Sequence, residues 1–325
     1  MSQDQGSRYS PPGYLRNAHL QTIFNSQGLR KLRARRLQKS FETVNLVLQA
    51  DDGTRLLADL DRSRAGNNGL VVLLHGWEGS SQSAYLVTTA ARLLREGYDT
   101  LRVNLRDHGD SHHLNPELFN STRSAEVASA IENFVSDHAC PKIFIAGFSL
   151  GGSFGLRIAA DSGEAIGLSC AVAISPPIDP SHAMDALNQG FFAYERYFFD
   201  RWYRSLQRKL EAFPELAYQD DLAVSHSLDD LNRLFIPKFT PYDKLSDYFA
   251  AYALTGDRLA GLAMPAHLIA ASDDPIIPVS DLDRINAGAN LHIERYDFGG
   301  HCGFLQNLLG DSWVEDRLLE ILRAF

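Results

Sequence analysis

The chain carries a serine in a setting that suits nucleophilic catalysis. Ser149 lies at the centre of the pentapeptide GFSLG at 147–151, between a predicted strand at 142–146 and a predicted helix at 151–161. A serine on a sharp strand-to-helix turn projects its Oγ beyond the sheet edge, and flanking glycines avoid a Cβ clash with the neighbouring strand and helix. The helix N-terminus also places a positive dipole where negative charge develops during acyl transfer. The pattern therefore predicts a serine nucleophile.

A serine nucleophile needs a base, and His301 is the histidine best placed to supply it. It lies in FGGHCGF at 298–304, just after the last predicted strand. Glycines on either side allow a tight loop to carry the imidazole over the sheet edge. Of the 11 histidines, His301 alone combines this position with this context. We therefore expect His301 to take the proton of Ser149.

The base in turn needs an acid that holds the imidazole tautomer and stabilises the imidazolium. The segment ASDDPIIP at 271–278 follows a predicted strand and offers Asp273 and Asp274. We favour Asp274, which stands four residues before the second proline, as is usual for this acid. Asp179, after the preceding strand, is a third candidate.

Acyl transfer also needs donors for the oxyanion. One should be the backbone N–H of Leu150, the residue after the nucleophile, and the other should come from the loop HGWEGS at 75–80. We expect Trp77 to supply this second N–H. His75 is better interpreted as a residue that shapes the loop than as an acid or base.

Three histidines and two aspartates lie in the segment RDHGDSHH at 106–113. They lack an HxH or HxxxH pairing with a distal ligand, which a specific metal site would show. We interpret the segment as a polar loop close to the mouth of the site, and we expect neither a metal nor another cofactor.

The elements that must position these residues alternate between strand and helix. Apolar runs separated by helical patterns indicate a mostly parallel sheet covered on both faces, and so an α/β fold. The predicted strands are 41–49, 54–60, 70–74, 100–105, 142–146, 168–174, 267–271 and 291–296, the first two forming a hairpin through an Asp-Gly turn. The predicted helices are 17–24, 84–95, 122–138, 151–161, 280–287 and 312–325.

We divide the chain into a basic lead segment (1–40, extended over 1–14), a first core part (41–175), a helical lid or cap insertion (176–265) and a second core part (266–325). The insertion shows no convincing strand and is rich in aromatic residues. These aromatics either form a small core of their own or face the site as a lid or acyl pocket.

The net charge of −9 hides two unlike regions. Residues 5–41 hold eight basic residues and no acid, so the remainder carries −17, which argues against nucleic-acid binding. Three interpretations of the basic arm stay open: a helix with solvated arginines and packed leucines, a weak contact with anionic lipid headgroups, or pairing with the acidic body. The first has Arg30, Arg33 and Arg36 in solvent and Leu29, Leu32 and Leu37 on the body.

Cysteine usage and the N-terminus indicate a cytoplasmic protein. Cys140, Cys170 and Cys302 are odd in number and widely spaced, which is typical of free thiols in a reducing compartment. The first 15 residues lack the apolar core of a secretory signal. No apolar run approaches the roughly 18–20 residues that span a bilayer.

At these residues the chain resembles the α/β-hydrolase fold, and more closely the YheT-like (AB hydrolase-4) family. The match runs from about residue 12 to 325 and rests on LRNAHLQTI at 15–23, HGWEGS at 75–80, GFSLGG at 147–152 and SDDP at 272–275. The resemblance implies an esterase or lipase-like serine hydrolase with Ser149, Asp274 and His301 as its triad. The chain departs from the family at 104–110, where an Asn-Arg-Gly-like loop is more usual.

The leading hypothesis is hydrolysis of a small-molecule carboxylic ester through an acyl-enzyme on Ser149. An acyltransferase or thioesterase would use the same three residues, because these activities differ in the leaving group or acceptor that the pocket admits. A third hypothesis, from another class, is a non-catalytic binding protein with this fold.

Overall fold

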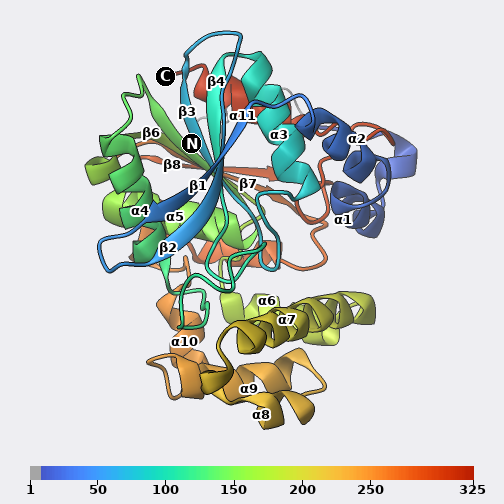
Figure 1. Cartoon of the computed structure of the whole chain (residues 1–325). Coiled ribbons are helices and arrows are strands. Elements are labelled where there is room, and N and C mark those ends of the chain that lie inside the picture. Colours follow the sequence, from blue (N-terminus) through green and yellow to red (C-terminus); the bar gives the residue numbers. More distant parts are fainter. Residues whose placement is uncertain (1–8) are drawn as a thin grey trace.

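The computed structural model describes residues 9–325, and the strands form a single eight-stranded sheet (Figure 1). Its order is β1-β2-β4-β3-β5-β6-β7-β8. The strands are β1 (Thr43–Gln49), β2 (Arg55–Asp61), β3 (Gly69–Leu74), β4 (Tyr98–Val103), β5 (Ile143–Phe148), β6 (Leu168–Ile174), β7 (Ala266–Ala271) and β8 (Leu291–Tyr296). Of the predicted lead segment, residues 1–8 lie outside the described part of the chain.

The sheet has an antiparallel end and a parallel body. β1 pairs with β2 through the predicted Asp-Gly hairpin, and β2 runs antiparallel to β4. Every other neighbouring pair is parallel. The predicted mostly parallel sheet is therefore confirmed, and parallel strands bring their carboxyl ends, with the loops that follow them, to one edge.

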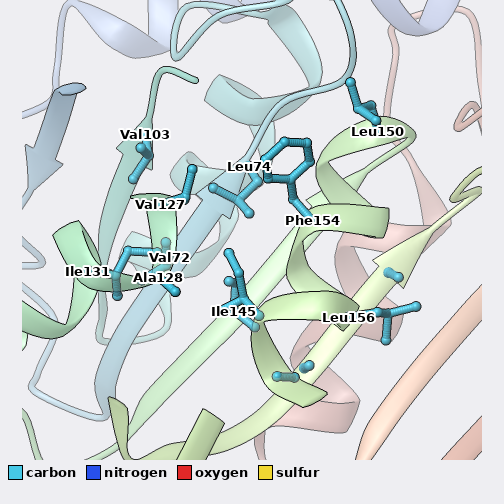
Figure 2. Packing of buried hydrophobic residues seen from close by; sticks show 14 of the residues in the cluster. Val72, Leu74, Val103, Val127, Ala128, Ile131, Ile145, Leu150, Phe154 and Leu156 are labelled. Carbon is cyan, nitrogen blue, oxygen red and sulfur yellow. The ribbon is translucent and has the colours of Figure 1, made fainter. Parts of the chain in front are cut away.

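Helices cover both faces of the sheet. One face packs on α4 (Ser124–Ser136) and α5 (Leu150–Ile166), and the other on α3 (Ala84–Arg95) and α11 (Trp313–Leu322). Figure 2 shows the first of these interfaces, where side chains of β3, β4 and β5 meet those of α4 and α5. Buried side chains from the strands fill the space between the sheet and the helices on both faces. This close packing makes the sheet a rigid support for the loops at its edge.

The chain between β6 and β7 forms helices and 3₁₀ turns, and Figure 1 shows these helices gathered beyond one edge of the sheet. They are α6 (Pro180–Gln189), α7 (Phe192–Ala212), η2 (Pro214–Leu216), α8 (Gln219–Ala223), α9 (Leu228–Phe239), α10 (Leu245–Ala251) and η3 (Asp257–Leu259). Both interpretations of the aromatics hold in part, since Tyr218 and Phe235 are buried in a core of these helices while Phe198 and Trp202 line a cavity. We keep 176–265 as a proposed cap.

Two helices precede the sheet, and the first interpretation of the basic arm is wrong for Arg30, Leu29 and Leu32. In α1 (Ala18–Ser26) the buried residues are the polar Gln21 and Asn25. In α2 (Gly28–Gln38) Arg30 is buried, whereas Leu29 and Leu32 are each 51% exposed.

The physical reason is a set of polar partners on the body of the protein. Arg30 contacts Glu315 of α11 at 2.5 Å and Thr88 of α3 at 2.9 Å, and Arg33 pairs with Asp311. These contacts turn the arginine face of α2 inward. Part of the basic arm therefore pairs with the acidic body, as the third interpretation of this arm expects.

The predicted helix at 280–287 is also wrong. The segment forms a 3₁₀ helix, η4 (Val279–Arg284), and then returns to extended backbone. The Gly256 N–H donates to the Arg284 carbonyl, and the Gly256 carbonyl accepts the Asn286 N–H. A β-bridge between Gly256 and Ile285 therefore replaces the next helical turn.

Candidate active site

Ser149 lies on the turn between β5 and α5 with a φ of +53°, in a region that side-chain-bearing residues rarely adopt. Glycines allow this close packing: a Cβ on Gly147 would lie 2.1 Å from the carbonyl oxygen of Gly151, and one on Gly151 would lie 2.4 Å from that of Leu74. The Ser149 N–H donates to the Ile174 carbonyl at 2.8 Å. The sharp turn expected from the pentapeptide is therefore present, held between β3 and β6.

Two hydrogen bonds link Ser149, His301 and Asp274. Nε2 of His301 lies 2.9 Å from Oγ of Ser149, and Nδ1 lies 2.9 Å from Oδ2 of Asp274. The other Asp274 oxygen accepts the backbone N–H groups of Ile276 and Ile277 at 2.9 and 3.0 Å. Because Nδ1 donates its proton to a carboxylate fixed in this way, Nε2 is left to accept the proton of the serine.

The two alternative acids have other partners. Oδ1 of Asp273 accepts the Gly300 N–H at 2.8 Å, and its Oδ2 is buried without a hydrogen-bond partner among residues 9–325. Asp179 caps α6 and pairs with Arg284 at 2.5 Å. The hydrogen bond to His301 belongs to neither of them.

Burial and the Asp274 carboxylate act in opposite directions on the His301 ring. Burial lowers the pKa of His301, because an imidazolium loses hydration, and the neighbouring carboxylate raises it. The carboxylate outweighs burial, so the pKa of His301 lies well above its ordinary value. The ring can therefore hold a proton until a leaving group takes it.

The predicted oxyanion donors both lie next to Ser149. Leu150 is the first residue of α5, so its N–H belongs to the open N-terminus of that helix. Trp77 follows Gly76, whose loop approaches the serine so closely that a Cβ on Gly76 would lie 3.1 Å from the Ser149 Cβ. Two backbone N–H groups near a nucleophile are what an oxyanion hole requires.

Two side chains from other elements hold the loop that carries Trp77. Tyr85 of α3 accepts the Gly76 N–H at 3.0 Å, and Arg201 of α7 donates two hydrogen bonds to the Glu78 carbonyl at 3.0 and 2.5 Å. Glu78 itself has a φ of +56°. A helix beyond the sheet edge and a helix on the sheet thus fix one loop.

His75 shapes the same loop, in agreement with the sequence interpretation. Its Nδ1 donates to the Gly76 carbonyl at 2.8 Å and its Nε2 accepts the Leu105 N–H at 3.1 Å. Burial lowers the pKa of His75 to about 3, so the ring is neutral. Both ring nitrogens are occupied by the backbone.

The polar segment at 106–113 anchors α7. Asp107 accepts a hydrogen bond from the buried Lys209 amine at 2.7 Å, and His112 Nε2 lies 2.8 Å from the Ser205 hydroxyl. Within residues 9–325, no group of three or more His, Cys, Asp or Glu side chains is arranged to hold a metal ion.

The sequence interpretation missed the residues that hold the His301 loop, and they come from α1. The Thr22 hydroxyl accepts the His301 N–H at 2.9 Å, and the Gln21 side chain accepts the Leu305 N–H at 2.7 Å. A Cβ on Gly300 would lie 2.5 Å from the carbonyl oxygen of Ala18, so the loop and helix are in close contact. The motif at 15–23 was the available signal, but no role could be assigned to it from sequence.

Two cavities meet at Ser149. The narrow one has a volume of about 90 Å³ and is mostly apolar, with Leu150, Met184, Leu187 and Trp202 among its lining. The wide one, of about 620 Å³, opens between α1, α2 and α7 and includes His301. Both are lined by Trp77, Ser149, Phe198 and Ile276, and the Trp77 and Phe198 rings stack 5.3 Å apart.

Over residues 9–325, no helix is both long and apolar enough to cross a bilayer.

The sequence matches known proteins at the level of the family. The model of the alpha/beta hydrolase family matches residues 71–308. The monoacylglycerol lipase of Saccharomyces cerevisiae is 20% identical over 79% of this chain and 59% of its own length. The YheT protein of Escherichia coli is 22% identical over 95% of this chain and 91% of its own, which confirms the resemblance stated from the motifs.

A solved structure agrees on the fold. The Pyrococcus furiosus esterase Pf2001 superposes with a TM-score of 0.59 at 18% identity, covering 90% of this chain and 95% of that one. At this identity the likeness concerns the fold alone. The family model, however, covers well over half of the sequence, and the chain therefore belongs to the alpha/beta hydrolase family.

Proposed function

We propose that the protein is a serine hydrolase that cleaves carboxylic esters through an acyl-enzyme on Ser149. Nε2 of His301 takes the hydroxyl proton while Oγ attacks the ester carbonyl carbon, and the N–H groups of Trp77 and Leu150 bind the resulting oxyanion. The ester C–O bond then breaks and the leaving alcohol takes the proton from His301. Water, activated by the same ring, hydrolyses the acyl-enzyme and restores Ser149.

The observation that carries this proposal is the hydrogen-bonded chain from Ser149 Oγ through His301 to Asp274, with 2.9 Å at each step. This chain supports His301 as a base in the required tautomer, and Ser149 as a nucleophile on a turn with positive φ. The lipase and esterase names of similar proteins lend further support to an ester substrate. Three free cysteines support a reducing, cytoplasmic compartment for the same proposal.

The narrow cavity suits the acyl group. Its lining is mostly apolar and reaches both Ser149 and Leu150. At about 90 Å³ it is smaller than the cavity of roughly 150 Å³ that binds benzene in an engineered protein. We therefore propose short acyl groups, of about four carbons, as the best fit.

A labelling experiment tests the proposal. A fluorophosphonate probe should label the wild-type protein and not Ser149→Ala, and p-nitrophenyl butyrate should be hydrolysed only by the former. Ser136→Ala, an exposed serine on α4, is the matched control and should behave as wild type. Equal labelling of wild type and Ser149→Ala would overturn the assignment, and no labelling with no turnover would favour the binding-protein hypothesis.

Acyl transfer is a second candidate, and the size of the wide cavity favours it. About 620 Å³ beside His301 gives room for an acceptor alcohol or a thiol leaving group as well as water. Adding an alcohol during turnover and measuring new ester against free acid would separate transfer from hydrolysis.

A further inference from the structure

The position of His301 gives the two cavities different roles. This step rests on the proposed function. In ester cleavage the leaving oxygen must take its proton from Nε2 of His301, so the leaving group lies on the side of that ring. His301 lines the wide cavity and Leu150, an oxyanion donor, lines the narrow one. The leaving group therefore occupies the wide cavity.

The wide cavity has the size of a ligand site. Its volume of about 620 Å³ falls within the usual range of small-molecule pockets. Polar side chains along its wall include those of Asn25, Ser26, Gln38, Gln82 and Ser83. Of these, Asn25 already accepts a hydrogen bond from Arg30, and Gln38 and Gln82 bond to each other. Both cavities are mostly apolar, and the wide one differs in the cationic side chains along its wall, so a leaving group with an anionic end would match it.

The charges along the wide cavity are predominantly positive. Lys31 and Arg35 of α2 line it one helical turn apart, and neither has an ion-pair partner within residues 9–325. Arg201, the third cation, is engaged by the Glu78 carbonyl.

Glu78 is the only acidic residue among the described residues that line this cavity. Burial raises the pKa of Glu78 to about 8, although Arg201 acts against this shift, so the carboxyl is largely uncharged at neutral pH. The positive charge of Lys31 and Arg35 is therefore not balanced inside the cavity.

The two cations of α2 also differ from their neighbours. Arg30 and Arg33, on the side facing the body, are paired with Glu315 and Asp311. Side chains at i and i+4 lie about 5–6 Å apart at Cβ, so two such cations can contact one dianion together. A guanidinium in addition binds phosphate oxygens in a bidentate manner.

We propose that the wide cavity is a leaving-group site for a phosphate-bearing alcohol, held by Lys31 and Arg35, so that the preferred substrates are short-chain acyl esters of phosphorylated alcohols.

The test uses two water-soluble esters that differ in the phosphate alone, 1-butyrylglycerol and 1-butyrylglycerol 3-phosphate. Wild type should show a kcat/KM at least 10-fold higher for the phosphate ester. Lys31→Gln/Arg35→Gln should lose this preference by at least 10-fold, chiefly through a higher KM for the phosphate ester, so that its kcat/KM values for the two esters become similar. Glycerol 3-phosphate should inhibit wild type competitively and the double variant much less, whereas inorganic phosphate alone should inhibit weakly if the whole alcohol is recognised.

Arg36→Gln/Lys39→Gln is the matched control, because it removes the same charge from two exposed residues, one at the end of α2 and one just beyond it, that do not line the cavity. Equal kcat/KM of wild type for the two esters would overturn the proposal. An equal loss of the preference for the phosphate ester in both double variants would also overturn it, because it would indicate a general electrostatic attraction of the phosphate to the helix. If neither ester is hydrolysed, the proposed function fails, and the phosphate site is then tested by calorimetry alone. Binding of glycerol 3-phosphate to wild type but not to Lys31→Gln/Arg35→Gln would support the site, and equal binding to both would overturn it.

Discussion

The hydroxyl of Thr22, on the second turn of α1, accepts the backbone N–H of His301 at 2.9 Å. The same hydroxyl donates to the Ala18 carbonyl at 2.8 Å, so its orientation is fixed within the helix. A residue near the start of the chain therefore positions the loop of the candidate base, 279 residues further on.

Replacing Thr22 should weaken catalysis without removing it. Thr22→Val leaves the partly buried His301 N–H without its acceptor, which costs about 1–3 kcal/mol and allows the ring to shift. We expect kcat for p-nitrophenyl butyrate to fall about 10-fold with KM nearly unchanged. Thr22→Ser keeps the hydroxyl and should restore most of the activity. A Thr22→Ser variant as impaired as Thr22→Val would contradict this role.

The two neighbouring aspartates should respond very differently to amidation. Asp274→Asn can favour the wrong His301 tautomer, and the corresponding change in a serine protease lowers kcat by about 10⁴. We expect a loss on the order of 10³–10⁴-fold. Asp273→Asn keeps an oxygen for the Gly300 N–H and should cost less than about 10-fold. Comparable losses of kcat in both variants would contradict the assignment of Asp274 as the acid that orients His301.

These residues show what the sequence could predict about the site. The serine turn, the glycine-flanked histidine and the acid after β7 each leave a local pattern, and the structure brings Ser149, His301 and Asp274 together at the sheet edge. Most of the central strands were predictable for a similar reason, because β3, β5, β6 and β7 are short, buried apolar runs.

What the sequence could not predict depends on contacts between distant residues. The orientation of α2 follows from the contact of Arg30 with Glu315, 285 residues away, and no local hydrophobic pattern contains that information. The same holds for the contact between Thr22 and the His301 loop. Apolar periodicity assumes that a helix buries its apolar face, whereas α2 buries an arginine that pairs with the buried Glu315.

Activity should depend on pH through the charge of His301. The Asp274 carboxylate raises the pKa of His301 above its ordinary value, against the opposing effect of burial. A protonated ring cannot accept the serine proton, so kcat/KM should fall as pH decreases through this pKa. We expect the midpoint of the acidic limb above about 6.5, the ordinary histidine value. In Asp274→Asn the limb should move to lower pH, and an unchanged midpoint would show that another group controls it.

The buried pair of Arg30 and Glu315 should matter for stability. Removing one charge leaves the other buried without compensation, which typically costs 3–5 kcal/mol. We expect Glu315→Gln to lower the free energy of unfolding in urea by about 3 kcal/mol. Arg33→Gln is the control, because its pair with Asp311 is partly exposed and should contribute less than about 1 kcal/mol. Equal effects of the two substitutions would contradict a special role for the buried pair.

The narrow cavity should set the acyl chain length. Met184 of α6 lines it, and its sulfur accepts a weak contact from the Asn232 amide at 3.7 Å, so Met184→Ala enlarges the cavity without removing a strong hydrogen bond. Wild type should prefer p-nitrophenyl butyrate to the octanoate. Met184→Ala should raise the octanoate-to-butyrate ratio of kcat/KM by at least 10-fold, since more methylenes can be buried. Met264→Ala, at a buried methionine outside both cavities, controls for general loosening and should leave that ratio unchanged. If Met184→Ala also leaves the ratio unchanged, the acyl group does not lie in this cavity.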